Sequence, residues 1–264
     1  MKIIPICNQK GGVAKTTTAI NISVYLALKG QKTLLIDLDP QANATSGVGV
    51  EKKEGTTIYN VLHGDITIEQ AQKNTGVEKL SLISSDISLT GAEVELVSML
   101  AREHRLKKAL NDVREKFDFV IIDCPPSLGL LTINALTAAT SVIIPIQCEY
   151  YALEGVIQLV NTINLIKNNL NNEMFIEGVL LTMADYRTKL TKEVIDEVRK
   201  HFGEKVYKTV IPRAIKLTEA PGFGKPIALY APDSPGAKKY EEVVCEILKI
   251  PIERSEIEGI QQEV

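Results

Sequence analysis

The sequence contains no tryptophan, and aromatic residues make up only 5% of its 264 residues. The core must therefore rest on isoleucine, leucine, valine and alanine, a composition that favours a buried parallel sheet covered by helices. No apolar run reaches the roughly 20 residues that a membrane-spanning helix needs. Lys10 and the glycines interrupt the amino-terminal apolar stretch, so it does not match a cleaved signal. These absences predict a cytoplasmic protein with no membrane partner.

The four cysteines form no CxxC pair and show no spacing typical of zinc sites. Cys7, Cys124 and Cys148 lie in or directly after apolar runs. A reduced cysteine in such a place behaves as a small hydrophobic residue. We therefore expect buried free thiols rather than zinc ligands.

The formal net charge of −3 does not by itself favour a nucleic-acid partner. The charges are, however, unevenly distributed. From Arg187 to Lys239 there are twelve Lys or Arg and six Asp or Glu, a local charge of +6, which leaves −9 on the remainder. A basic carboxy-terminal third on an acidic body is the pattern of an anion-binding surface.

Short apolar runs alternate with amphipathic stretches along the chain. The predicted strands are residues 2–7, 33–37, 80–83, 119–123, 141–146, 176–182 and 206–211. The predicted helices are residues 16–29, 91–111, 130–139, 153–169, 191–202 and 234–248. This alternation predicts an α/β fold with a doubly wound, mostly parallel sheet flanked by helices, and ligands at the carboxyl ends of the strands.

No low-complexity linker divides the chain, so residues 1–250 are expected to form one domain, followed by an acidic tail at 251–264. Two of the predicted strands contain a proline, Pro5 and Pro145. A central strand rarely tolerates proline because a ladder hydrogen bond is lost. Pro5 is therefore expected at the first residue of its strand.

A glycine-rich segment follows the first predicted strand and precedes a helix; it consists of Lys10, Gly11, Gly12, Val13, Ala14, Lys15, Thr16 and Thr17. Glycines let successive backbone N–H groups turn inward around phosphate oxygens, and the helix amino terminus adds partial positive charge. Lys15 supplies a charge to the β and γ phosphates, and the Thr16 hydroxyl is a Mg²⁺ ligand. The segment predicts a P-loop that binds ATP and Mg²⁺.

One position departs from the P-loop pattern, which has glycine directly before the lysine where this chain has Ala14. A Cβ there crowds the phosphate or resists a positive φ. Alanine is the smallest such intrusion, so we expect ATP binding to be tolerated. A degenerate loop with weakened binding is the open alternative.

Acidic residues close two of the predicted strands. Asp123 ends the apolar run Phe119–Asp123 in the Walker B form, where the carboxylate holds Mg²⁺. The alternative role for Asp123 is to cap the next helix near Ser127. Asp37 and Asp39 project to the same side of their strand, which suits one for structure and one for the attacking water.

Lys10 before the double glycine marks the deviant Walker A group of P-loop ATPases. Together with six further segments it closely resembles the ParA/Soj chromosome- and plasmid-partitioning ATPases of the ParA/MinD superfamily. The segments are 37–46 (DLDPQANATS), 122–129 (IDCPPSLG), 147–155 (QCEYYALEG), 180–183 (LLTM), 210–213 (VIPR) and 217–221 (LTEAP). The resemblance extends from about residue 1 to residue 245.

This resemblance implies an ATPase that binds Mg-ATP, forms a face-to-face homodimer and binds double-stranded DNA without sequence preference. Slow hydrolysis, stimulated by a ParB-type protein, would release the DNA, and the protein would be associated with the nucleoid. By position, the implied roles are Lys10 for the partner's phosphates, Lys15 for the bound nucleotide, Thr16 and Asp123 for Mg²⁺, Thr17 for phosphate, Asp39 for the attacking water and the metal shell, and Pro212 and Arg213 for the adenine. Glu149 is a candidate for contact with the partner's nucleotide.

The basic third contains the candidate DNA-binding residues. They are Arg187, Lys189, Lys192, Arg199, Lys200, Lys216, Lys238 and Lys239. Such a surface neutralises phosphates without reading bases, and the resemblance singles out Arg187 and Lys216. A solvated helical face is the alternative for any single lysine.

Three other functions share parts of these motifs. A MinD-like membrane-cycling ATPase ends in a basic amphipathic helix, whereas residues 241–264 are rich in glutamate. A nitrogenase-reductase-like electron donor needs a second cysteine near residues 85–110 for its iron–sulfur cluster, and none is present there. A small-molecule kinase needs an acceptor site that the sequence does not reveal.

Overall fold

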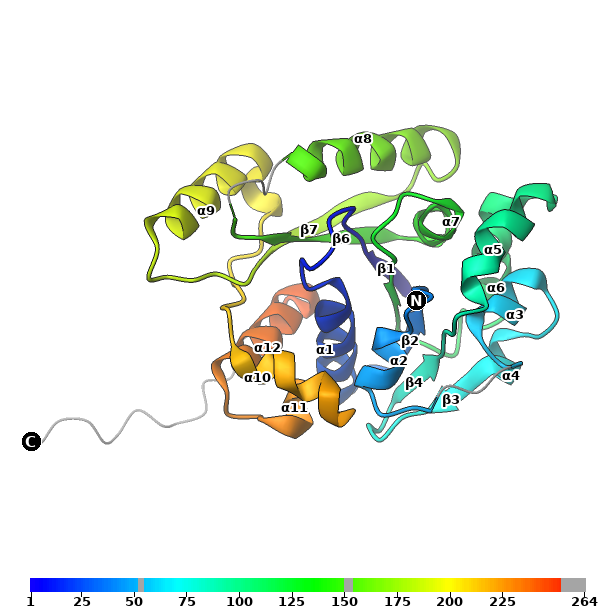
Figure 1. Ribbon diagram of the computed structural model, residues 1–264, viewed down its shortest axis with the longest axis horizontal. Coiled ribbons are helices and arrows are strands. Elements are labelled where there is room, and N and C mark those ends of the chain that lie inside the picture. Colours follow the sequence, from blue (N-terminus) through cyan, green and yellow to red (C-terminus); the bar gives the residue numbers. More distant parts are fainter. Residues whose placement is uncertain (52–54, 150–153, 253–264) are drawn as a thin grey trace, which may run out of the picture.

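A seven-stranded sheet lies at the centre of the molecule, with helices on both faces (Figure 1). The computed structural model describes residues 1–51, 55–149 and 154–252. The strand order is β3-β4-β2-β5-β1-β6-β7, and every neighbouring pair is parallel except β3–β4. The strands are β1 Lys2–Ile6, β2 Thr33–Asp37, β3 Gln72–Asn74, β4 Leu80–Ile83, β5 Phe119–Asp123, β6 Ser141–Gln147 and β7 Phe175–Thr182. The predicted doubly wound α/β fold is confirmed.

Helices connect these strands along the described chain. The α-helices are α1 Lys15–Leu28, α2 Asn43–Gly47, α3 Ile58–His63, α4 Ile68–Ala71, α5 Leu89–Glu95, α6 Arg105–Asn111, α7 Leu130–Ala138, α8 Glu154–Asn169, α9 Lys189–Phe202, α10 Ile215–Glu219, α11 Ile227–Tyr230 and α12 Pro235–Leu248. Short 3₁₀ turns are η1 Leu96–Ser98, η2 Arg102–His104, η3 Gly203–Lys205 and η4 Ala220–Phe223. None of the described helices is long and apolar enough to cross a bilayer.

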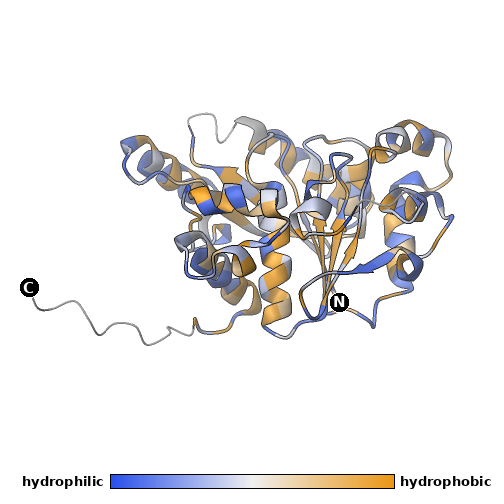
Figure 2. Ribbon diagram, turned by 60° about the horizontal axis from the view of Figure 1, so that its bottom comes forward, coloured by the Kyte–Doolittle hydropathy of each residue, from blue (hydrophilic) through white to orange (hydrophobic). Residues whose placement is uncertain are grey.

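Each face of the sheet has its own hydrophobic core. Successive strand residues point to opposite faces, so Leu34 and Ile36 of β2 join the core under α3, α5, α6 and α7, whereas Leu35 joins the core under α1 and α12. Burial on both faces explains why the central strands are continuously apolar in sequence, as the colouring of Figure 2 shows. The two covered faces leave the strand ends as the places where loops can form a site.

The strand predicted at residues 206–211 is wrong. This segment makes only isolated parallel bridges, Val179 with Val206 and Ala184 with Pro212. The reason lies in α12, where the Glu246 carboxylate accepts the backbone N–H groups of Lys208 and Thr209, each at 2.8 Å. These amides are therefore not free to extend a ladder along β7.

The single helix predicted at residues 91–111 is also wrong. Four shorter elements, α5, η1, η2 and α6, occupy this stretch. Met99 is extended (φ −83°, ψ 141°) and Ala101 is left-handed (φ 51°), so the helical path stops between them. The apolar spacing in the sequence continues across the break and therefore conceals it.

Pro5 was predicted to be the first residue of its strand, and this prediction is wrong. It lies inside β1. The N–H groups of Ile3 and Cys7 both point toward β6, donating to Thr140 Oγ1 at 2.9 Å and to the Ile143 carbonyl at 3.1 Å. The Pro5 nitrogen faces the same side because N–H directions alternate along a strand. On that side β1 and β6 share only one register pair, so the proline removes little of the ladder.

The described chain extends through Ile252, and the predicted tail at 251–264 falls almost wholly outside the described residues.

Candidate functional site

Three predicted site segments meet at the carboxyl ends of β1, β2 and β5. In the register, Asp123 of β5 is opposite Ile6 of β1 on one side and Asp37 of β2 on the other. The loop from β1 into α1 therefore lies over both carboxylates, near the middle of Figure 1. This is the position at which open α/β sheets bind ligands.

The glycine-rich loop is held at both ends by side chains from neighbouring strands and loops. The Asn8 side chain donates to the Pro145 carbonyl at 2.7 Å and accepts from the Lys10 N–H at 3.0 Å. The Thr182 hydroxyl, at the end of β7, donates to the Val13 carbonyl at 3.2 Å. These contacts fix the loop before any ligand binds, which reduces the ordering cost of binding.

The position before Lys15 requires a left-handed backbone. Gly12 has φ 75°, and Ala14 has φ 66° and ψ 31°. For an L-residue with a Cβ, the left-handed region costs roughly 1–2 kcal/mol. Ala14 therefore strains the start of α1, as the sequence suggested, and yet the loop keeps the wrapped shape.

We expect Ala14→Gly to raise the free energy of unfolding by about 0.5–1 kcal/mol, because relief of the left-handed strain exceeds the entropy that glycine adds to the unfolded chain. Urea denaturation measures this difference. Ala19→Gly, within α1, is the matched control and should lower stability by about 1 kcal/mol. An Ala14→Gly protein no more stable than the parent would show that the loop relieves the strain by other means.

Lys15 is nearly buried, and its ammonium donates to the Lys10 carbonyl at 2.9 Å. Burial lowers the pKa of Lys15, and the Asp123 carboxylate is the strongest of the groups that oppose this shift. A buried ammonium whose hydrogen-bond partner in the described chain is a neutral carbonyl gains when a phosphate arrives. The P-loop role predicted for Lys15 fits this environment.

Asp123 is fully buried, and neither of its carboxylate oxygens has a hydrogen-bond partner among the described residues. Burial, followed by the charge of nearby Asp37, raises the pKa of Asp123 well above its usual value, and the Thr16 hydroxyl opposes that shift. An orphaned buried carboxylate is costly, and a divalent cation relieves it. Asp123 and Thr16 therefore fit a Mg²⁺ ion, whereas the alternative of a cap near Ser127 has no hydrogen bond to support it.

The two aspartates after β2 differ in their surroundings. Asp37 is fully buried and accepts the N–H and the hydroxyl of Thr45, both at 2.7 Å, and the N–H of Asp39 at 3.2 Å. Burial is the main reason that the pKa of Asp37 is raised, to about 6. Asp39 accepts the Gln41 N–H at 2.9 Å, and its charge acts on both Lys15 and Asp123. Asp37 thus organises the loop, and Asp39 is the carboxylate whose charge reaches both Lys15 and Asp123.

The Lys10 side chain forms an ion pair with Glu149, which follows β6. Its ammonium lies 3.7 Å from the Glu149 carboxylate, which is also 3.5 Å from the Arg213 guanidinium. All three side chains are at least one-third exposed, so these pairs are weak. Glu149 therefore holds Lys10 and Arg213 together beside the loop without burying either.

A cavity of about 490 Å³ lies beside the phosphate loop and brings Ala14 and Thr17 together with Pro212 and Arg213. Sequence reasoning had named these four residues from separate motifs. It missed the other apolar lining residues, among them Met183, Leu217 and Pro221, although these three lie within the segments that carried the resemblance. An apolar slot at the end of a phosphate loop has the character expected for a purine base.

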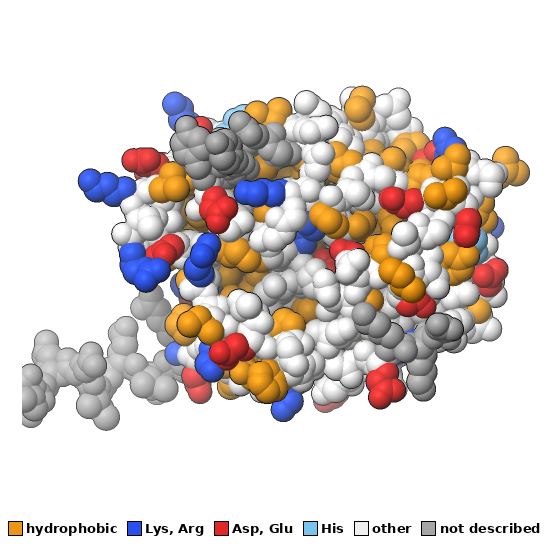
Figure 3. Space-filling model, viewed as in Figure 1, with side chains coloured by type: hydrophobic (Ala, Val, Ile, Leu, Met, Phe, Trp, Pro, Cys, Tyr) orange, Lys and Arg blue, Asp and Glu red, His pale blue; other side chains and the backbone are white. Residues whose placement is uncertain are grey.

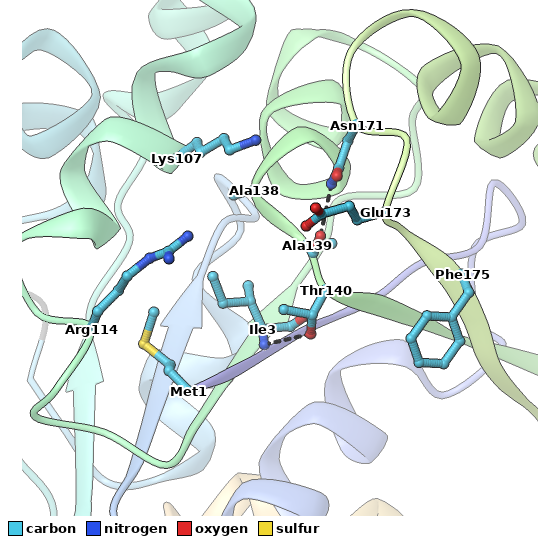
Figure 4. A pocket seen from close by; sticks show the side chains of 10 residues that line it. All are labelled: Met1, Ile3, Lys107, Arg114, Ala138, Ala139, Thr140, Asn171, Glu173 and Phe175. Carbon is cyan, nitrogen blue, oxygen red and sulfur yellow. Dashed lines mark hydrogen bonds between the residues drawn. The ribbon is translucent and has the colours of Figure 1, made fainter.

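A second cavity, of about 350 Å³, opens at the amino ends of β1, β6 and β7. Figure 4 shows Lys107 and Arg114 on one side of it and Asn171 and Glu173 on the other. It lies at the opposite edge of the sheet from the glycine loop, and none of the predicted nucleotide residues lines it. The candidate nucleotide site is therefore the one at the carboxyl edge.

The two residues predicted to contact DNA both sit in local ion pairs. Arg187 donates to the two oxygens of Asp185 at 2.8 and 2.6 Å, which lowers the pKa of that carboxyl to about 2. Lys216 donates to Glu219 at 3.0 Å and lies over the Tyr230 ring. Exposed pairs of this kind contribute little to stability, so both cations remain accessible to an external phosphate.

Comparison with known proteins agrees with this geometry. A family described as an AAA domain matches residues 1–176. The sporulation initiation inhibitor protein Soj of Bacillus subtilis is 56% identical over 247 residues, covering 93% of this chain and 98% of that protein. The chromosome-partitioning ATPase Soj of Treponema pallidum is 49% identical, covering 94% and 97%. Cobyrinic acid a,c-diamide synthase of Mycobacterium smegmatis, solved with an ATP analogue and magnesium, superposes with a TM-score of 0.84 at 38% identity, covering 94% and 95%.

Proposed function

We propose that this chain, which belongs to the Soj/ParA family of chromosome-partitioning ATPases, uses Mg-ATP as a switch for holding and releasing DNA. With ATP bound it forms a face-to-face homodimer that binds double-stranded DNA without reading its sequence. Slow hydrolysis, stimulated by a ParB-type protein, returns it to a form that leaves the DNA. The observation that carries the proposal is the burial of Lys15 at the glycine loop together with Asp123, a buried carboxylate that has no hydrogen-bond partner among the described residues.

Nucleotide binding follows from complementary charges at that site. The γ and β phosphates would replace the Lys10 carbonyl as partners of Lys15, and Mg²⁺ would take Thr16 and Asp123 as protein-side ligands. When bound, Mg²⁺ supplies positive charge to the phosphate oxygens. Pro212 and Arg213 border the slot that the base would occupy.

Dimerisation is proposed from Lys10. Its side chain is more than one-third exposed, and its ion pair within the described part of the chain is the weak one with Glu149. If a second subunit approached this face, Lys10 of each subunit would contact the phosphates of the nucleotide bound to the other. Such a reciprocal contact is an isologous arrangement. Gel filtration in ADP, in ATP and without nucleotide tests this step; an elution volume that never changes would contradict it.

DNA binding is proposed from the basic third of the chain. Lys and Arg side chains gather on the α9 side of the view in Figure 3, and α9 carries Lys189, Lys192, Arg199 and Lys200. Phosphate contacts of this kind add across the two subunits of a dimer and weaken with salt. Exposed lysines in sufficient number thus give retention on DNA without base contacts.

We expect Arg187→Ala with Lys216→Ala to weaken ATP-dependent DNA binding at least tenfold at about 0.1 M salt. The slope of log affinity against log salt should become shallower by about two for each subunit, since each phosphate contact contributes roughly 0.9. Fluorescence anisotropy on a random-sequence duplex measures both quantities. The matched control is Lys107→Ala with Arg114→Ala, which removes equal charge at the opposite edge. If the Arg187/Lys216 variant bound DNA as the parent does, the two side chains would be ordinary solvated surface charges that do not contact DNA.

The membrane-cycling alternative depends on the carboxy-terminal segment, most of which lies outside the described residues. Its acidic composition argues against binding to anionic lipid. Co-sedimentation with phosphatidylglycerol vesicles in ATP distinguishes the two functions, because only a membrane-cycling ATPase would pellet with them. A nucleoid-associated location is the corresponding proposal for the DNA switch.

A further inference from the structure

Two cysteine side chains meet where the central strands β1 and β5 end. All four cysteines of the chain are free and buried. The thiol of Cys7 donates to the sulfur of Cys124 at an Sγ–Sγ distance of 3.1 Å. Both residues are only 1% exposed, and both belong to the core under α3, α5, α6 and α7. Nucleotide binding as proposed above uses neither thiol.

This contact follows from the register of the sheet. Cys7 is the residue after β1 and Cys124 is the residue after β5, and the last register pair of these parallel strands is Ile6 with Asp123. Neighbouring strands lie about 4.8 Å apart, which is within the Cα separations of about 4.4–6.8 Å that disulfides span. Both side chains point to the same face of the sheet, since both join one core. The backbone therefore holds the two sulfurs where an S–S bond can form.

Each thiol adjoins a residue that shapes the nucleotide site. Asp123, the carboxylate that fits Mg²⁺, directly precedes Cys124. Asn8 directly follows Cys7, and its side chain accepts the Lys10 N–H of the glycine loop at 3.0 Å. A disulfide of about 2.05 Å would bring the two sulfurs about 1 Å closer than the present 3.1 Å. Such a bond would displace the start of the glycine loop, the magnesium carboxylate, or both.

We propose that Cys7 and Cys124 form a reversible oxidation site, in which a peroxide joins the two sulfurs as a disulfide that weakens Mg-ATP binding. The formation of the bond follows from the sheet geometry alone, whereas its effect on ATP rests on the proposed function. In reducing compartments the disulfides that do occur are usually transient and serve catalysis or redox sensing. The pair at the ends of β1 and β5 has the position that such a sensor needs.

Hydrogen peroxide is the oxidant. In the first step one cysteine sulfur attacks a peroxide oxygen, the O–O bond breaks, and a sulfenic acid forms while water leaves with the thiol proton. In the second step the other sulfur attacks the sulfenic sulfur, the S–OH bond breaks, and a second water leaves with the second thiol proton. Two thiols and one peroxide thus give one disulfide and two waters, and the two electrons lost by the sulfurs reduce the peroxide.

Burial determines how this pair reacts. A buried thiol reacts slowly with oxidants, so the first step depends on local opening of the chain. The second step needs no further opening, because the second sulfur already lies against the first. Ring closure therefore outruns further oxidation of the sulfenic acid to the irreversible sulfinic acid.

Mass spectrometry of the peroxide-treated protein tests the bond. We expect digestion without reductant to release a peptide pair that joins Cys7 to Cys124 and has lost two hydrogen atoms, and dithiothreitol should separate it. Cys148→Ser is the matched control, because it changes another buried cysteine of the same core and leaves the pair intact; it should form the same crosslink. Oxidised parent protein in which the two cysteines stay thiols, become sulfinic acids or crosslink elsewhere would overturn the proposal.

Isothermal titration with Mg-ATP tests the effect of the bond. We expect the oxidised parent to bind at least tenfold more weakly than the reduced parent, since a misplacement of about 1 Å in a preorganised site is enough to cost about 100-fold. Dithiothreitol should restore the affinity, which distinguishes the disulfide from methionine sulfoxide, a product that reductase enzymes reverse. Cys7→Ser should bind as the reduced parent does, before and after peroxide. If its affinity fell with peroxide as the parent's does, another group would cause the loss.

Thermodynamic linkage provides a measurement on the parent alone, which does not depend on the folding of any variant. If the disulfide weakens Mg-ATP binding tenfold, Mg-ATP must oppose the disulfide by the same factor. At a fixed ratio of oxidised to reduced dithiothreitol, saturating Mg-ATP should therefore lower the ratio of disulfide to dithiol protein at least tenfold. An unchanged ratio would show that the bond does not act on the nucleotide site. Failure of the proposed function looks different, because the reduced parent would then not bind Mg-ATP although the crosslink still forms.

Discussion

Lys15→Met is expected to reduce the affinity for Mg-ATP by about 100-fold or more, the largest binding loss that any single exchange in this chain should cause. Removing one partner of a buried charge pair costs roughly 2–5 kcal/mol. Lys15 is the buried ammonium of the glycine loop, and methionine keeps the length of its apolar stem while removing the charge. The loss should therefore be electrostatic and leave the packing of α1 intact.

Isothermal titration with ATP in the presence of Mg²⁺ measures this effect directly. Lys32→Met, an exchange of the same type at an exposed position before β2, is the control and should bind as the parent does. Thermal unfolding without nucleotide should show closely similar midpoints for the parent and the Lys15 variant. Binding within threefold of the parent would show that the ammonium does not meet the phosphates, and the P-loop assignment would fail.

The positions of the central strands were predictable because a buried parallel strand leaves a distinct hydrophobic pattern in the sequence. The strands at 33–37, 80–83 and 119–123 have the predicted bounds, since buried parallel strands are short, continuous apolar runs. The convergence of Lys15 with Asp123 was predictable for a similar reason, because parallel strands place their carboxyl ends at one edge. Motif spacing thus predicted which residues meet at this edge of the sheet.

The parts that sequence reasoning missed depend on contacts between distant segments. Glu246 on α12 takes the amides that a strand at 206–211 would need, and no local pattern reveals this partner. The break at Ala101 is set by a backbone angle rather than by composition. The edge strand β3, which is antiparallel and polar, has no apolar run to indicate it.

At Ala14 the sequence and the structure provide different information about the same position. The motif identified the position as a glycine site, and the structure measures the left-handed angle that makes it one. The same geometry bears on the affinity for nucleotide. Ala14 lines the cavity that also contains Pro212 and Arg213, so under the proposed function we expect its methyl group to lie beside the base rather than among the phosphates.

Asp39→Asn should reduce ATP turnover by about 100-fold or more while leaving Mg-ATP affinity within a few-fold of the parent. A carboxylate that positions or deprotonates the attacking water contributes typically 10²–10⁴-fold, and asparagine preserves its shape without its basicity. Asp39 suits this role because Asp37, two residues earlier, already uses its oxygens on Thr45 and on the Asp39 N–H. We therefore expect Asp37 to stabilise the loop and Asp39 to act on the attacking water.

Single-turnover hydrolysis with radiolabelled ATP distinguishes the two aspartates. Asp37→Asn replaces one acceptor oxygen of the Thr45 network by an amide, so it should lower the unfolding midpoint as well as turnover. Asp39→Asn should leave the unfolding midpoint unchanged and prolong the ATP-bound state. Under the proposed switch, the Asp39 variant should therefore remain dimeric and retained on DNA long after the parent has dissociated. If turnover of the Asp39 variant stayed within threefold of the parent, another residue would position the attacking water. If the variant left DNA promptly despite slow turnover, DNA release would not depend on hydrolysis.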